Sequence, residues 1–385
     1  MSDIRLDGDA FFEDPYPTYR RMRNNHPAFR DEATGFWFLS RHADVIAALA
    51  APDHFSSARG NALVDSPQRV GMTLGSMDPP RHDELRRVIM RGVTPQRIEA
   101  MIPAMRAHLA QILERVVPSG QCDFVRDISR PVLFGALGRM LGLDDEAAVR
   151  AAELSAMLFR GEGGPAGPAL SEEYRTQVVA FIREQLEKRR SNRSDDLLSV
   201  LIEAQEAGAP LADAEIVANM MTVLLAGNAS IGHFLPNLVH ALWLHPEQRH
   251  SVKKDPSLAD AAIEEGLRWD TSTQCFARQT TREVEIAGAR IAADSRVVLI
   301  YASANRDDAA FENAEKFDLS RGRTRHVGFG SGPHICLGAP TALAMLRSIL
   351  QDMLATIGDY ELDLKNAVRV KHLMARGFRS LPISW

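Results

Sequence analysis

The residues with the clearest chemical potential surround one cysteine, Cys336, in the segment HVGFGSGPHICLGA (326–339). Glycines at 328, 330 and 332 allow the backbone ahead of the cysteine to turn tightly and to approach a flat ligand closely. Cys336 precedes a predicted helix start near Pro340, where backbone N–H groups and the helix dipole favour a thiolate, the form that binds metals. No second cysteine or histidine cluster completes a zinc site, so a lone thiolate indicates haem iron. The alternative is a buried structural cysteine.

The elements that must position this segment are mostly helical, and we expect a mainly α fold with a small β part in a single domain, 1–385. The pattern predicts a strand over 36–39, a helix over 42–49, helices dominating 81–141 and 171–189, and a flexible loop over 161–167. A strand pair is predicted from 283–286, the Ala287-Gly288 turn and 297–300. An apolar run covers 216–244, and a last helix begins at about Pro340.

Composition excludes several classes of protein. The formal net charge of -5 gives no reason to expect a nucleic-acid partner. Only Cys122, Cys275 and Cys336 are present, which favours a reducing compartment, and we expect a cytoplasmic protein. The first residues are acidic and lack an apolar core, so neither a signal peptide nor a membrane anchor is expected. The apolar run 216–244 contains two histidines, three asparagines and a proline, so it is predicted to be a buried core helix.

The cysteine segment resembles the signature of the cytochrome P450 family, F-G-x-G-x-H-x-C-x-G. The matching residues are Phe329, Gly330, Gly332, His334, Cys336 and Gly338. The resemblance implies the P450 fold, with haem b between a long central helix and the helix that follows the cysteine loop. It also implies that Cys336 is the axial ligand of the haem iron and that Phe329 and Gly330 border the haem. The implied activity is that of a monooxygenase, which activates oxygen.

Glu265 and Arg268 match the E-x-x-R pair of this family, which is structural and supports the segment that leads to the cysteine loop. Three residues apart, they share a helical face and can form a charge-assisted pair. Arg321, in FDLSR (317–321), resembles the usual third partner. A bare E-x-x-R is otherwise a common solvated pair.

Haem carries two propionates, which need cationic or donor partners when they are buried. DPPRHDELR (78–86) resembles the family motif D-P-P-x-H-x-x-x-R and places His82 and Arg86 one helical turn apart. Arg278 matches the arginine that follows the E-x-x-R helix, and His334 is a fourth candidate. Together they are predicted to bind the propionates, although each alone could be an ordinary surface side chain.

The segment LLAGNASI (224–231) resembles the A-G-x-[DE]-T stretch that crosses the oxygen side of the haem. Ala226 would border the haem. Asn228 and Ser230 are the candidate catalytic residues, because the acid of most relatives is replaced by Ala229 and the alcohol is Ser230. A serine can still donate a hydrogen bond. The alternative is that Ser230 bonds back to its own helix.

Substrate and partner signals are weaker. Thr271, Ser272, Thr273 and Gln274 are unusually polar for a segment that faces the substrate in relatives, which favours a substrate with a hydrogen-bonding group. The alternative is that these side chains bond to nearby backbone. Arginines at 321, 323 and 325, with Arg87 or Arg91, could form a basic surface for an acidic ferredoxin, or a merely solvated loop.

Three functional hypotheses follow. The first is a monooxygenase that oxidises a small or medium organic molecule with electrons from a ferredoxin and its reductase. The second is a haem-thiolate enzyme with other chemistry, such as NADH-dependent nitric oxide reduction or oxidative coupling, because AGNA followed by a hydroxyl residue resembles the nitric-oxide-reducing branch. The third, a haem sensor, has no appended signalling segment to support it.

Overall fold

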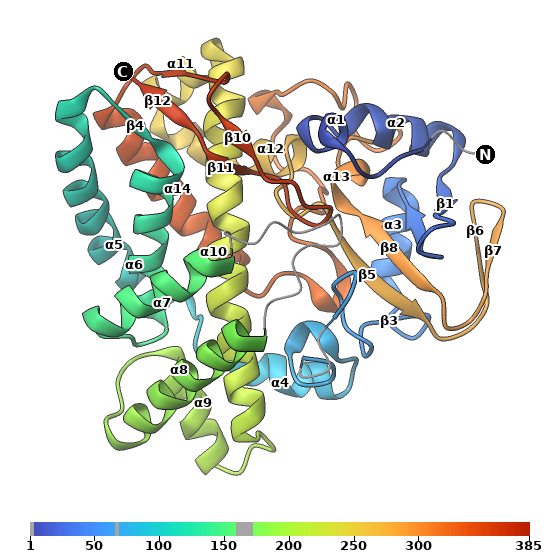
Figure 1. The fold of residues 1–385 in the computed structure, drawn as a ribbon, viewed down its shortest axis with the longest axis horizontal. Helices are drawn as coiled ribbons and strands as arrows, with labels where there is room; N and C mark the ends of the chain where they lie inside the picture. Colours follow the sequence, from blue (N-terminus) through green and yellow to red (C-terminus); the bar gives the residue numbers. More distant parts are fainter. Residues whose placement is uncertain (1–3, 66–68, 159–171) are drawn as a thin grey trace.

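The computed structural model describes residues 4–65, 69–158 and 172–385, and it places a large helical part beside a smaller part rich in strands (Figure 1). The predicted mainly α fold with a small β part is confirmed. The predicted loop over 161–167 lies outside the described residues. The helices of the described chain are α1 Asp9–Glu13, α2 Tyr16–Asn25, α3 His42–Ala50, α4 Arg81–Met90, α5 Pro95–Val116, α6 Arg130–Met140, α7 Asp145–Leu158, α8 Glu172–Ser191, α9 Leu197–Glu206, α10 Asp213–Leu244, α11 Pro246–Lys254, α12 Ala259–Trp269, α13 Tyr301–Ala304 and α14 Ala339–Thr356.

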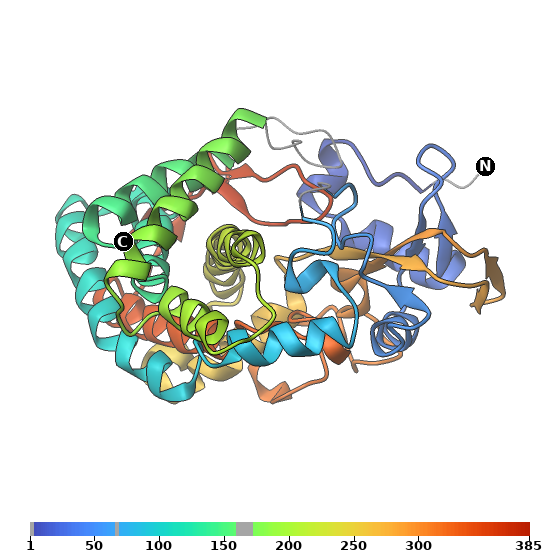
Figure 2. The same ribbon diagram turned by 90° about the horizontal axis from the view of Figure 1, so that it is seen from below.

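The long helix α10 is the axis of the helical part, and Figure 2 shows it nearly end-on with other helices around it. Its 32 residues are long and apolar enough to cross a membrane by length and composition, with a mean hydropathy of 1.3 over its most apolar window. However, α10 packs against α6, α8 and α12, and its apolar residues belong to the main hydrophobic clusters. Protein side chains therefore cover the apolar faces of this helix, as expected for a core helix.

A five-stranded sheet in the order β1-β2-β8-β5-β3 forms the smaller part, with β2 and β8 parallel and the other pairs antiparallel. Its central strand β8 is buried over its last four residues, as the continuous apolar run there requires. The described strands are β1 Ala28–Arg30, β2 Trp37–Leu39, β3 Phe55–Ser56, β4 Gln121–Asp123, β5 Cys275–Thr280, β6 Val284–Ile286, β7 Ala289–Ile291, β8 Arg296–Ile300, β9 Glu361–Leu362, β10 Val368–Arg369, β11 Phe378–Ser380 and β12 Pro382–Ser384.

The predicted pairing of 283–286 with 297–300 is wrong. Ala287 and Gly288 both have positive φ, 51° and 78°, which makes a two-residue turn that returns the chain at once. As a result β6 pairs with β7, a strand that the sequence analysis missed, and β8 pairs with β2 and β5. The error arose because the apolar run 297–300 is a more obvious strand than Ala289–Ile291.

Local signals explain where several helices begin. The Thr94 side chain accepts a hydrogen bond from the backbone N–H of Arg97 and caps α5, whose first residue is Pro95. Asp196 caps α9 by accepting from the N–H of Ser199 at 2.8 Å. Helices dominate 81–141 as predicted, and the short strand β4 interrupts them after Gly120 turns the chain at a φ of 65°.

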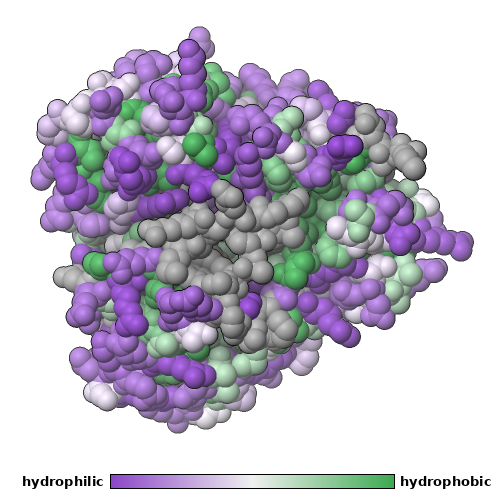
Figure 3. Space-filling model, viewed as in Figure 1, coloured by the Kyte–Doolittle hydropathy of each residue, from purple (hydrophilic) through white to green (hydrophobic). Residues whose placement is uncertain are grey.

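The surface facing the viewer in Figure 3 is mostly hydrophilic, with smaller apolar areas between. This distribution is ordinary for a protein surface in water.

Candidate functional site

The cysteine loop is a tight turn that ends at the first turn of α14. The N–H of Cys336 donates to the carbonyl of Phe329 at 2.8 Å, and the N–H of Gly330 donates to the carbonyl of Val327 at 2.9 Å. Gly330 and Gly332 have positive φ, 73° and 68°, and any side chain at Gly332 would collide with the carbonyl of Leu49. The glycines are therefore required by both the turn and the packing.

Two opposing influences act on the thiol of Cys336. Burial is the larger and raises its pKa, although the residue is exposed by its accessible surface. The N–H groups of Gly338 and Ala339 and the charge of Arg86 act in the other direction and lower the pKa. An accessible sulfur that is surrounded by protein and receives N–H donors suits a metal ligand, because a bound cation would stabilise the thiolate further.

The loop is anchored by two residues that the sequence analysis missed. The Asn305 side chain accepts from the N–H of Val327 at 2.7 Å and donates to Thr271 at 2.8 Å. The His326 ring lies 3.0 Å from the Glu264 carboxylate. No sequence signal singled out Asn305, since its contacts join segments far apart in the chain.

Four predicted donors lie together beside the loop. The rings of His82 and His334 have centroids 4.3 Å apart. The charges of Arg278 and Arg86 both act on His334, and burial, Arg278, His82 and Arg86 together lower the pKa of His334 to about 3. Arg278 is buried, with its guanidinium against the carbonyl of Ala277 at 2.8 Å. Residues from α4, β5 and the cysteine loop thus converge on one place.

This cluster fits an anionic group. The Nε2 atoms of His82 and His334 are buried and have no hydrogen-bond partner within the described part of the chain. The carboxylate that contacts His82 belongs to Asp83 and lies on the other ring nitrogen, Nδ1, at 2.8 Å. Buried unpaired polar atoms are costly, so the geometry favours a ligand that pairs with these nitrogens, and the neighbouring Arg86 and Arg278 favour an anionic one, as the two propionates of haem would be.

The E-x-x-R pair is buried and completes a network below the cysteine loop. Arg268 binds the Glu265 carboxylate through Nε and Nη2, both at 2.7 Å, and donates to three carbonyls, those of residues 305, 314 and 316. Glu265 also accepts from Arg321 at 3.3 Å and from the N–H of Asp318 at 2.9 Å. The pair is therefore satisfied on every side and fixes the chain that leads to Cys336.

On α10, the structure records no hydrogen bond from the Ser230 hydroxyl to another described residue. The carbonyl of Ser230 does accept a hydrogen bond, from the Ser272 hydroxyl at 3.1 Å. This contact joins α10 to the segment after α12, and sequence reasoning did not foresee it. The side chains of Ala226 and Asn228 lie outside the described part of the structure, so their predicted roles stay predictions.

The polar segment 271–274 uses most of its hydrogen bonds inside the protein. Thr271 donates to the carbonyl of Leu267 at 2.8 Å, and Gln274 accepts from the Tyr19 hydroxyl at 3.0 Å. Both side chains are buried. Thr273 forms a bridge with Ala375. These contacts match the alternative of bonding within the protein, and they weaken the argument for a polar substrate.

The predicted basic surface is smaller than expected. Arg321 is largely buried in the Glu265 network and cannot serve a partner. The side chains of Arg323, Arg325, Arg87 and Arg91 are exposed.

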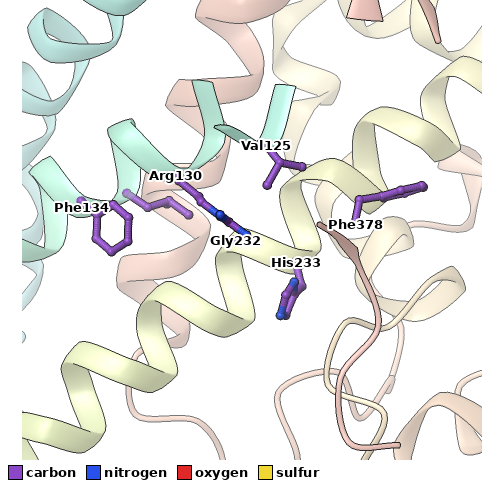
Figure 4. Close-up of a pocket in the computed structure, with 7 residues that line it drawn as sticks. Val125, Arg130, Phe134, Gly232, His233 and Phe378 are labelled. Atoms are coloured by element: carbon purple, nitrogen blue, oxygen red, sulfur yellow. The ribbon is translucent and has the colours of Figure 1, made fainter. Parts of the chain in front are cut away.

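A small pocket lies beyond Ser230 along α10, on the side that faces α6 (Figure 4). It is lined by Val125, Arg130, Leu133, Phe134, Gly232, His233 and Phe378. Burial, with the charges of Arg130 and His372, lowers the pKa of His233 to about 3, so this histidine is neutral at pH 7. None of its lining residues belongs to the cysteine loop or to the donor cluster, so this pocket is not the place where haem would bind.

Comparison with known proteins agrees with this geometry. The family model described as cytochrome P450 matches residues 169–374. A putative cytochrome P450 123 of Mycobacterium tuberculosis is 33% identical over 97% of this chain and 94% of its own length. A steroid C26-monooxygenase of the same species is 31% identical, with 95% and 92% covered. The solved structure of cytochrome P450 CYP109Q5 from Chondromyces apiculatus superposes with a TM-score of 0.90 at 28% identity, covering 98% of this chain and 97% of that one.

The chain belongs to the cytochrome P450 family, and it is an oxygen-incorporating oxidoreductase whose cofactor is haem b. Cys336 is the cysteine at the ligand position of the family signature. The convergent donors beside it are the residues that fit the propionates.

Proposed function

We propose that this protein is a monooxygenase that oxidises a small or medium organic molecule with single electrons from a ferredoxin and its reductase. We infer further that it acts as one domain over 1–385 in the cytoplasm. The observation that carries the proposal is the meeting at one site of an accessible cysteine, N–H donors to its sulfur, two arginines and two histidines whose Nε2 atoms are buried and unpaired in the described part of the chain. Haem bound there would supply oxygen activation, and the thiolate ligand favours O–O cleavage.

The residues of this chain would divide the work as follows. Cys336 would hold the iron, and His82, Arg86, Arg278 and His334 would bind the propionates and so orient the ring. Phe329, Gly330 and Ala226 would border the haem.

On the oxygen side, Ser230 and Asn228 would take over proton delivery. Most relatives have an acidic residue at the position of Ala229. The alanine side chain here cannot carry a proton. The Ser230 hydroxyl makes no hydrogen bond to another described residue, so it is available to donate one to a reacting group or to a water.

The substrate is proposed to be predominantly apolar. Relatives at similar identity are named for different substrates: a steroid C26-monooxygenase, and a linalool 8-monooxygenase of Pseudomonas putida at 29% identity. The side chains of Thr271, Ser272 and Gln274 donate hydrogen bonds to backbone carbonyls inside the protein, and they are therefore not free to bind a polar substrate. Specificity would then depend on the shape of an apolar pocket more than on paired charges.

Electron supply is proposed to occur at the exposed arginines Arg323 and Arg325, with Arg87 and Arg91 as further contacts. An acidic ferredoxin would be steered to this basic surface, and steering weakens as salt screens the charges. Changing Arg325 to Glu should slow ferredoxin-supported reduction several-fold at low salt, with little change at high salt.

The test that separates this proposal from its alternative is NADH oxidation by the purified haem protein alone, without oxygen, with and without nitric oxide. The proposal predicts no consumption in either case, followed by consumption once ferredoxin, its reductase and oxygen are added. Rapid NADH consumption only with nitric oxide would contradict the proposal and would favour direct hydride transfer from NADH. That is the chemistry of the nitric-oxide-reducing branch, which the AGNA segment followed by Ser230 resembles. In that case Ala229→Asp should leave turnover unimproved.

A further inference from the structure

A second cavity lies away from the cysteine loop and the donor cluster. Its volume is about 220 Å³, far above the roughly 10–15 Å³ that holds one water. It is partly open to solvent and is lined by the turn between α4 and α5, the first half of α5, the end of α6, the turn before α9 and the first turn of α14. The lining residues are 92, 93, 97, 98, 100, 101, 104, 139, 140, 195–197 and 341.

Three polar atoms of this lining are buried without a hydrogen-bond partner in the described part of the chain: the Thr341 hydroxyl, Nη1 of Arg97 and Oδ2 of Asp196. The Asp196 oxygen is nevertheless neutralised by an ion pair, because it lies 3.0 Å from Nε of Arg189. The two donors have no such compensation. The Thr341 side chain is only 4% exposed, yet its hydroxyl makes no hydrogen bond, not even to its own helix. The Nη1 atom of Arg97 is buried and unbonded, while its Nη2 atom pairs with Asp195 at 2.6 Å. Buried donors without acceptors are uncommon in folded proteins, because each one loses the hydrogen bonds that water would give it.

The acids near the cavity are already engaged. Asp195 is used by Arg97, and Asp196 caps α9 and pairs with Arg189 at 3.0 Å. The unmet hydrogen-bonding capacity is therefore that of donors, the Arg97 guanidinium and the Thr341 hydroxyl. A ligand that satisfies both must bring an acceptor, and a carboxylate suits an arginine best.

Apart from Arg139, the remaining walls are apolar or glycine, and they include Ile98, Met101, Met140 and Leu197. A ligand with a short alkyl or single-ring body would bury its apolar surface against them. Such a division, apolar walls with a few placed donors, is the usual build of a small-molecule site.

We propose that this cavity is a second small-molecule site, which binds a carboxylate with a short apolar body through Arg97 and Thr341. It is separate from the haem site, and it does not depend on the proposed electron donor or substrate. Thr341 lies in the first turn of α14, five residues after Cys336, so a bound ligand would contact the helix whose start directs N–H groups at the Cys336 sulfur.

The test uses calorimetry on the full, haem-loaded protein, with hexanoate as the probe and 1-hexanol as its uncharged counterpart. Imidazole at saturation keeps the oxygen side of the haem occupied, and the absorption spectrum reports any displacement. We expect hexanoate to bind without a spectral change, and at least tenfold more tightly than 1-hexanol.

Three variants probe the site. Arg97→Gln and Thr341→Val should each weaken hexanoate binding about tenfold, and Ala104→Leu should abolish it by filling the space with the polar groups intact. The matched control is Arg106→Gln, which removes an arginine of the same helix that pairs with Asp352 outside the cavity. It should bind hexanoate as the unaltered protein does.

Absence of binding heat would overturn the proposal. So would equal affinities for hexanoate and 1-hexanol, or unchanged affinity in all three variants. Displacement of imidazole would overturn it too, because the probe would then be entering the haem site.

Discussion

At the scale of single residues, the site is defined by groups that lack partners as much as by those that have them. His82 and His334 are buried side by side with unbonded Nε2 atoms, and their cationic neighbours raise the cost of any further positive charge. A bound anionic group would pair with these buried nitrogens and offset the positive charge beside them. The sequence alone could identify His82, Arg86, Arg278, His334 and Cys336, because they occupy positions of a rare motif set.

Arg278 should contribute directly to haem retention. Arg278→Gln removes a buried cation from the propionate cluster, and a charged hydrogen bond of about 1.5–3 kcal/mol predicts at least a roughly tenfold faster loss of haem. The measurement is the rate of haem transfer to a haem-free acceptor protein. The control is Arg282→Gln, which removes an exposed arginine just after β5. An equal rate in both variants would argue against propionate binding by Arg278.

Ser230 should affect the coupling of the reaction, which is the fraction of consumed NADH that ends in oxidised substrate. Ser230→Ala removes the hydroxyl while keeping the space, so more reducing equivalents should end as hydrogen peroxide, by roughly fivefold for a hydrogen bond worth about 1 kcal/mol. The measured quantity is product formed per NADH consumed in the reconstituted system. Ser230→Thr should keep the coupling. Unchanged coupling in the alanine variant would assign proton delivery to other groups.

At the scale of elements, the fold was readable where periodicity and turn chemistry agreed. The strand at 36–39, the helix at 42–49 and the helix after the cysteine all appear within one residue of their expected bounds. The failures have physical causes. The short strand β7 carries little apolar signal. Arg321 was expected both as the third partner of the Glu265–Arg268 pair and as part of the basic surface, and the fold places it with Glu265.

The Glu265 network should contribute much more to the free energy of unfolding than an exposed ion pair does. Glu265→Gln leaves Arg268 buried with an uncompensated charge, which predicts a loss of about 3–5 kcal/mol in the free energy of unfolding. The control is Asp260→Asn, which breaks the exposed pair with Arg347 and should cost less than about 1 kcal/mol. Urea unfolding of both variants measures the difference. Similar losses would show that the network is not a special support of the loop.

At the scale of the whole molecule, α10 joins the helical part to the strand-rich part and carries several buried histidines and asparagines along one side. Asn237 donates to the carbonyls of Asp270 at 3.3 Å and Arg376 at 3.1 Å, and Ser272 donates to the Ser230 carbonyl. Polar residues that argued against a membrane helix thus serve to tie α10 to its neighbours. Their partners could not be predicted from the sequence, because each contact crosses at least 30 residues of chain.

The neutral His233 predicts a pH dependence of stability. The pKa of His233 falls from 6.5 in the unfolded chain to about 3 in the folded protein. Below about pH 6.5 this histidine is therefore protonated in the unfolded chain and still neutral in the folded protein. The fold should therefore lose about 2 kcal/mol from this residue between pH 7 and pH 5. His233→Gln should flatten the dependence of urea stability on pH over this range, with the exposed His250→Gln as the control. An unchanged slope would contradict the burial of a neutral imidazole.

The central claim, that Cys336 supplies a thiolate to the haem iron, is tested most directly by the absorption spectrum of the reduced protein under carbon monoxide. The unaltered chain should show the strongly red-shifted Soret band that a thiolate ligand produces. Cys336→Ala should lose that band, whereas Cys122→Ser, which replaces a cysteine far from the loop in sequence, should keep it. Survival of the red-shifted band in Cys336→Ala would contradict the account.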